Sequence, residues 1–263
     1  TTLTVELSEA TDAVRDGSFE RALNLLKVIL KDHPDHIDSL YLAAVSSRYL
    51  KQFDDSKKYI EQLLMIAPDM GRAYQELGHL NRDMGDEEKA VVHYRQACEL
   101  NPALMAGWNF LYQYFVKNNN KPAADHALEQ INKLKSLPGV LLYIDQILNE
   151  GRLGMAEAKC RAFLKENPTH TYAMSLLSEI ANRLGYFDDA EFLLEKAVEF
   201  QPDDGDLRMK YASILRKKQK FAKTMEQVNI LCDKYPENLN YQAQKASEIM
   251  QNGDHEEAIN LLD

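Results

Sequence analysis

The sequence is poor in the features that mark membrane, secreted and nucleic-acid-binding proteins. No run approaches the roughly 18 apolar residues needed to cross a bilayer. Lysine and arginine number 31 against 41 aspartates and glutamates, so the net charge of -10 repels phosphate backbones and anionic lipids. The 3 cysteines are odd in number and widely spaced, which indicates reduced, buried thiols. We therefore expect a cytoplasmic protein that binds neither nucleic acid nor membrane.

Motifs of catalysis and of metal or cofactor binding are also missing. There is no His-Glu-x-x-His run, no Gly-x-Ser-x-Gly elbow, no paired-thiol motif and no Walker-type lysine loop. His33 and His36 flank Pro34-Asp35 like a metal cluster, but polar residues are expected in a turn in any case. We predict no catalytic residue, no cofactor and no metal in this segment.

What is present is an internal repeat, revealed by the prolines. Pro34, Pro68 and Pro102 are 34 residues apart, and so are Pro168, Pro202 and Pro236. The gap of 66 residues between the two sets is two short of two periods, so one repeat has lost two residues. The repeats fall at residues 3–36, 37–70, 71–104, 105–136, 137–170, 171–204 and 205–238, with a truncated eighth at 239–263. We predict a single array over residues 1–263 and expect it to be a piece of a longer protein, because the eighth repeat stops partway.

Each repeat carries two apolar stripes at helical spacing, separated by a polar break that often contains glycine. This pattern predicts a helix, a turn and a second helix, which the proline then ends. A pair of helices cannot bury its apolar side alone, so each pair must pack on its neighbours. The fold class predicted from the residues is all-α.

The third repeat is the most informative, and its large and small residues follow a known order. They are Tyr74, Leu77, Gly78, Gly85, Ala90, Tyr94, Ala97 and Pro102. In this order the chain resembles the tetratricopeptide repeat family. The resemblance implies a right-handed superhelical α-solenoid whose first helices line a concave groove. It also implies a scaffold that binds a protein or peptide in that groove, with no catalysis of its own.

The resemblance further implies which side chains would contact the partner in the middle of the array. The predicted peptide-binding groove residues are Tyr41, Arg48, Tyr49, Arg72, Gln75, His79, Arg82, Asn109, Gln113 and Lys117. Over all repeats the groove positions hold eight cations and five anions, so we expect an acidic partner. Most of these cations lie at helix C-termini, where they would also offset the helix dipole without any ligand.

Two alternatives stay open. The stretch from Gly71 to Trp108 also resembles the amino-terminal repeats of bacterial proteins in which a sulfotransferase domain follows the array. That resemblance implies a non-catalytic arm of a larger enzyme, used for substrate presentation or oligomerisation. The other alternative is a homodimer formed through the open C-terminal repeat, because an incomplete repeat exposes an apolar end.

Overall fold

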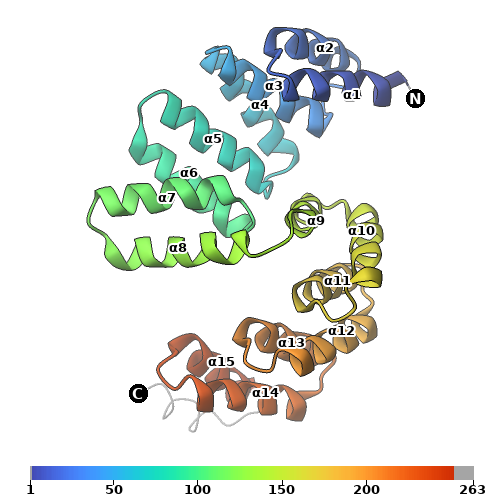
Figure 1. Ribbon diagram of the computed structural model, residues 1–263, viewed down its shortest axis with the longest axis vertical. Helices are drawn as coiled ribbons and strands as arrows, with labels where there is room; N and C mark the ends of the chain where they lie inside the picture. The colour runs from blue at the N-terminus through green and yellow to red at the C-terminus, as the bar shows by residue number, and fades with distance from the viewer. Residues whose placement is uncertain (1, 252–263) are drawn as a thin grey trace. The chain divides into compact units, whose positions relative to one another are not determined.

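The computed structural model describes residues 2–251, and within that range the chain forms α-helices and no strand (Figure 1). The helices up to residue 150 are α1 (Thr2–Arg15), α2 (Phe19–Asp32), α3 (Ile37–Tyr49), α4 (Phe53–Ile66), α5 (Gly71–Asp83), α6 (Glu87–Leu100), α7 (Met105–Lys117), α8 (Lys121–Lys135) and α9 (Gly139–Asn149). Those that follow are α10 (Leu153–Glu166), α11 (Thr171–Arg183), α12 (Phe187–Phe200), α13 (Gly205–Lys217), α14 (Phe221–Lys234) and α15 (Leu239–Gln251). The predicted all-α class, built from tandem helix-turn-helix repeats, is confirmed.

The turn inside each helix pair requires one residue in the left-handed conformation. The residues at this place are Gly17, Gly85, Gly151 and Gly185, and in other pairs Lys51, Asn119 and Gln219. Their φ angles lie between 55° and 84°. Glycine adopts such angles without a steric penalty, whereas lysine and glutamine do so at a cost of about 1 kcal/mol or more.

The loop between one pair and the next carries the proline and then a residue that caps the following helix. His36 Nδ1 accepts a hydrogen bond from the backbone N–H of Ser39 at 3.3 Å, and His170 Nδ1 accepts from Ala173 in the equivalent loop. Such caps satisfy backbone donors that the first turn of a helix leaves unpaired. His36, one of the two histidines in the apparent metal cluster at residues 33–36, is therefore a helix cap. Among the described residues, no group of three metal-ligating residues lies close enough together to hold a metal ion.

Small residues allow the two helices of a pair to touch. Ala44 and Ala90 are fully buried, and the hydroxyl of the buried Ser56 donates to the carbonyl of Ala44 at 2.9 Å. A Cβ added to Gly78 would lie 2.8 Å from the ring of Tyr94. The two helices of a pair therefore pack closely at these positions.

The apolar core runs between successive pairs. One cluster joins Leu40 of α3, Ile60 and Leu63 of α4, and Leu80 of α5, all at most 2% exposed. Burying each such side chain contributes about 1.5–3 kcal/mol. The first helices of consecutive pairs also contact one another, α1 with α3, α3 with α5 and α5 with α7. Residues on these helices can therefore act together across repeats.

The described chain divides into two compact units, residues 1–150 and residues 151–263. The division falls between the two helices of the fifth predicted repeat and follows the shortened fourth repeat. Each unit is by itself a stack of helix pairs, and a single array over all 263 residues stays a prediction. The predicted dimer contact falls partly on residues 252–263, outside the described residues. Within the described part, no helix has both the length and the apolar character to cross a membrane.

Candidate functional site

The candidate site is the face that α3, α5 and α7 share in unit 1, here called the first-helix face. On α5 it carries Arg72, Gln75, His79 and Arg82, which are three or four residues apart and so lie along one side of the helix. On α7 the equivalent positions of the next repeat hold Asn109 and Gln113, and α3 contributes Tyr41 and Arg48. The helical period alone thus places most of the predicted groove residues on one face.

Arg48 is the most buried cation of this face, with only 6% of its side chain exposed. Its Nε donates to Glu76 Oε1 at 2.5 Å and its Nη1 donates to Asp83 Oδ2 at 2.7 Å. Burial raises the pKa of Glu76 above its ordinary value although Arg48 opposes the shift. Arg48 therefore ties α3 to α5 and has almost no surface to offer a partner.

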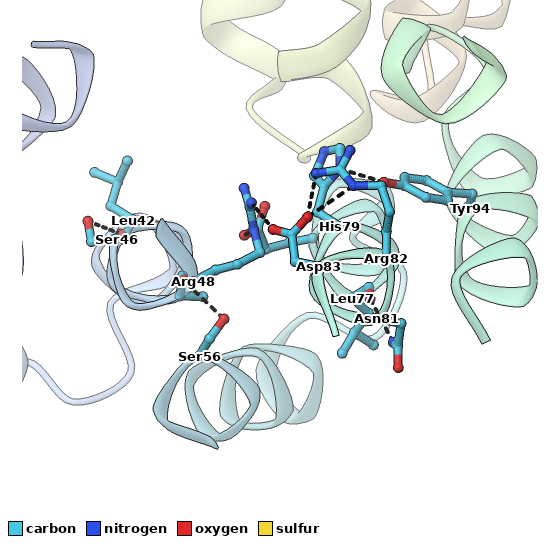
Figure 2. A network of polar contacts seen from close by, with 12 residues as sticks. Leu42, Ser46, Arg48, Ser56, Leu77, His79, Asn81, Arg82, Asp83 and Tyr94 are labelled. Carbon is cyan, nitrogen blue, oxygen red and sulfur yellow. Dashed lines mark hydrogen bonds and ion pairs between the residues drawn. The ribbon is translucent and has the colours of Figure 1, made fainter. Parts of the chain in front are cut away.

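Arg82 meets the same carboxylate from its own helix. Its Nε and Nη2 donate to Asp83 Oδ1 at 3.0 and 2.8 Å, so that Asp83 bridges two arginines, as Figure 2 shows. Burial raises the pKa of Asp83, but hydrogen bonds from Arg82 and Arg48 outweigh it and hold the pKa below its usual value. Asp83 is thus a permanently ionised centre between the two guanidinium groups.

Arg72 makes the third charged contact of the face. Its Nε lies 2.6 Å from Oε1 of Glu150, and its guanidinium carbon lies 4.3 Å from the centroid of the Tyr41 ring. The side chains of Arg72 and Glu150 are 18% and 8% exposed. Burial raises the pKa of Tyr41 to about 12, with a further contribution from Glu76. Tyr41 therefore stays neutral, and its ring makes a cation–π contact with Arg72.

The remaining cation, Lys117, is exposed and lies with its Nζ 2.6 Å from Glu87 Oε2. Each of the four predicted groove cations in α3, α5 and α7 thus contacts a carboxylate. Three of these partners, Glu76, Glu87 and Glu150, lie outside the positions assigned to the groove. The basic character expected for the middle of the groove is therefore largely neutralised by the chain itself.

His79 is hydrogen-bonded to its neighbour on α6. The hydroxyl of Tyr94 lies 2.5 Å from His79 Nδ1, and the two rings meet edge to face. A tyrosine hydroxyl can donate or accept, so this hydrogen bond forms with either tautomer of the neutral imidazole. Burial, together with the charges of Arg48 and Arg82, lowers the pKa of His79 to about 4. His79 is therefore a neutral hydrogen-bonding group at physiological pH.

Three amide side chains of the face have unused hydrogen-bonding capacity. Asn109 and Gln113 are exposed and make no side-chain hydrogen bond within residues 2–251. The Oε1 atom of Gln75 is buried and has no donor within the described chain. An amide offers both a donor and an acceptor, which matches the two polar groups of a peptide backbone.

Tyr49, the last of the predicted groove residues, lies elsewhere on α3. Its ring stacks on Phe19 of α2 with the ring centroids 4.2 Å apart, and 55% of the residue is exposed. The guanidinium carbon of Arg48 also contacts the Tyr49 ring, at 4.5 Å from its centroid. Tyr49 therefore belongs to a contact with the first repeat and does not join the amides of α5 and α7.

The sequence profile of the tetratricopeptide repeat family matches three stretches, residues 37–70, 71–104 and 172–204. This chain contains tetratricopeptide repeats. The matched stretches coincide with the helix pairs α3–α4, α5–α6 and α11–α12, so two of the three lie in the unit that carries the first-helix face.

Similar proteins are known among sequences and structures. Tetratricopeptide repeat protein 21B of Homo sapiens is 23% identical over 226 residues, which cover 82% of this chain but only 14% of that protein. A structure of Naa15/Naa10 bound to HypK-THB aligns over 95% of this chain and 39% of its own, with 18% identity and a TM-score of 0.46. MamA of Desulfovibrio magneticus RS-1 aligns over 51% of this chain and 75% of its own, with 20% identity and a TM-score of 0.44. The chain is thus similar to a small part of the human protein.

Proposed function

We propose that this tetratricopeptide repeat segment is a scaffold that binds a segment of a partner protein on the first-helix face of unit 1. The observation that carries the proposal is a row of amides with unused hydrogen-bonding capacity: Gln75 and Asn109 occupy equivalent positions of α5 and α7, and Gln113 lies one turn further along α7. Repetition of the same polar groups from one repeat to the next suits an extended peptide, whose backbone groups also repeat.

The energetics favour amides over cations as the main contacts. Arg48 is buried and meets two carboxylates at once, so pulling it away without a replacement carboxylate would leave buried charges unpaired at a cost of about 3–5 kcal/mol. The amides lose only water when they bind, and each new hydrogen bond contributes about 0.5–1.5 kcal/mol. The acidity of the partner, predicted from the cation count, stays a prediction.

The proposal can be tested with peptides selected for binding to the immobilised chain, whose affinities are then measured by calorimetry. The double variant Asn109→Ala/Gln113→Ala should bind the selected peptides about tenfold more weakly, because it removes about two hydrogen bonds. The matched control is Asn24→Ala/Asn132→Ala, which removes two exposed amides from the second helices α2 and α8. Equal affinities for the two double variants would show that the peptides bind elsewhere.

The alternative function, a non-catalytic arm of a larger enzyme such as a bacterial sulfotransferase, stays a prediction. It depends on the resemblance of the stretch from Gly71 to Trp108, whereas the family profile and the human relative reported above name tetratricopeptide repeats and not that enzyme class. Binding on the first-helix face is compatible with such an arm, since substrate presentation also requires a bound partner.

A further inference from the structure

The contact between Arg72 and Glu150 differs from the other ion pairs of the first-helix face. Glu150 is the C-terminal cap of α9, whereas Arg72 lies in the first turn of α5, two repeats earlier. The contact therefore brings a carboxylate from a distant part of unit 1 onto the face that we assign to the partner. Arg48, by contrast, meets Glu76 and Asp83 on the adjacent first helix.

The surroundings of Arg72 have the chemistry of a carboxylate-binding site. The Tyr41 ring lies against the guanidinium group at 4.3 Å and orients its plane, which leaves the N–H groups at its edge to meet an anion. Glu150 supplies that anion, with Oε1 2.6 Å from Arg72 Nε. The same oxygen accepts a hydrogen bond from Gln146 Nε2 at 3.1 Å, so Glu150 is held from its own helix while it contacts α5.

The position of this contact connects it to the proposed binding face. Gln75, whose Oε1 is buried and lacks a donor, follows Arg72 by three residues on the same side of α5. A peptide that crosses Asn109, Gln113 and Gln75 would reach Arg72 next. At that point it would find the guanidinium group already occupied by a carboxylate of the chain.

We propose that Arg72 and Tyr41 form a carboxylate-binding subsite, that Glu150 occupies it as an internal ligand, and that an acidic side chain of the partner displaces Glu150. The inference rests on the proposed function, since it assigns a partner side chain to the same face. It also makes binding self-limiting, because a partner must compete with a carboxylate that is always present. If Glu150 occupies the subsite in about nine-tenths of the molecules, its removal raises the apparent affinity about tenfold.

The test uses a blocked pentapeptide, acetyl-Ala-Ala-Glu-Ala-Ala-amide, titrated into the chain while NMR follows the Nε–H signal of Arg72. Glu150→Gln is expected to bind this peptide about tenfold more tightly than the natural chain does. The matched control is Glu61→Gln, which removes the same charge from unit 1 but only separates the exposed pair of Lys57 and Glu61 on α4. Adding Arg72→Gln to Glu150→Gln should abolish this gain in affinity. A peptide with glutamine in place of glutamate should bind Glu150→Gln no more tightly than it binds the natural chain.

Several results would overturn the inference. An equal gain in Glu150→Gln and Glu61→Gln would show a general effect of charge, and no gain in a folded Glu150→Gln protein would show that Glu150 only connects α9 to α5. If circular dichroism shows Glu150→Gln to be unfolded, Glu150→Asp withdraws the carboxylate by one methylene group and should still give a smaller gain, whose absence would also refute the idea. Selected peptides that still depend on Asn109 and Gln113 would leave the proposed function standing.

Discussion

Protonation of His79 should weaken the fold in a defined pH range. Its pKa is about 4 in the folded chain against 6.5 for an ordinary histidine, because burial and the nearby Arg48 and Arg82 disfavour the imidazolium. Since the folded pKa lies below the unfolded value, the stabilisation is present above about pH 6.5 and is lost as the pH falls towards about 4. Between about pH 7 and about pH 5 the loss amounts to about 2 kcal/mol.

The assay is urea unfolding followed by circular dichroism at a series of pH values, on the natural chain and on His79→Gln. Glutamine keeps an acceptor for the Tyr94 hydroxyl but cannot be protonated. Asp83 stays ionised through this range because its pKa is lowered, and the raised pKa of Glu76 affects both proteins alike. The difference between the two proteins therefore isolates His79. Parallel pH profiles would refute the argument that burial lowers the pKa of His79.

Two further substitutions test the packing of the repeats. Lys51→Gly and Gln219→Gly should each raise the free energy of unfolding by about 1 kcal/mol, because φ is 60° and 56° at these turns; Lys51→Ala, which keeps the strain, is the control and should not stabilise. Gly107→Ala should lower the free energy of unfolding by about 1–3 kcal/mol, because the new Cβ would lie 2.6 Å from Cys98 Sγ. Adding Cys98→Ala should restore part of that loss, and an additive double variant would contradict the clash.

The helices could be predicted from the sequence because a proline lies near the end of six of the repeats. The predicted starts at residues 37, 71, 105, 171, 205 and 239 are the first residues of α3, α5, α7, α11, α13 and α15. The fifth repeat deviates, since α9 begins at Gly139 and not at residue 137. Leu137 precedes Pro138, which disfavours the helical conformation there, and Pro138 itself is the N-cap. The deviation thus has a local cause that the sequence also contains.

The candidate site could be predicted only in part. Helical periodicity was enough to place Arg72, Gln75, His79 and Arg82 on one side of α5. The partners of these side chains could not be found in that way, because Glu76 and Glu150 pair across helices and depend on how neighbouring repeats pack. The sequence did contain one indication of a buried counter-ion. Glu76 is a charged residue that directly follows the groove position Gln75, and it is buried as the partner of Arg48.

The row of cations at the ends of the first helices had two explanations from sequence, a ligand or the helix dipole, and the structure adds a third. Arg48 reaches Glu76 on the next first helix, Arg216 of α13 contacts Glu248 of α15, and Lys217 of α13 donates to Asn182 of α11 at 2.8 Å. These cations connect first helices of neighbouring repeats. They pair with Glu76, Glu248 and Asn182, which would otherwise lack these partners. Arg72 lies outside this row, in the first turn of α5, and its carboxylate comes from a repeat that is not its neighbour. That difference is the reason to look for a partner's acidic group at Arg72 and not at Arg48.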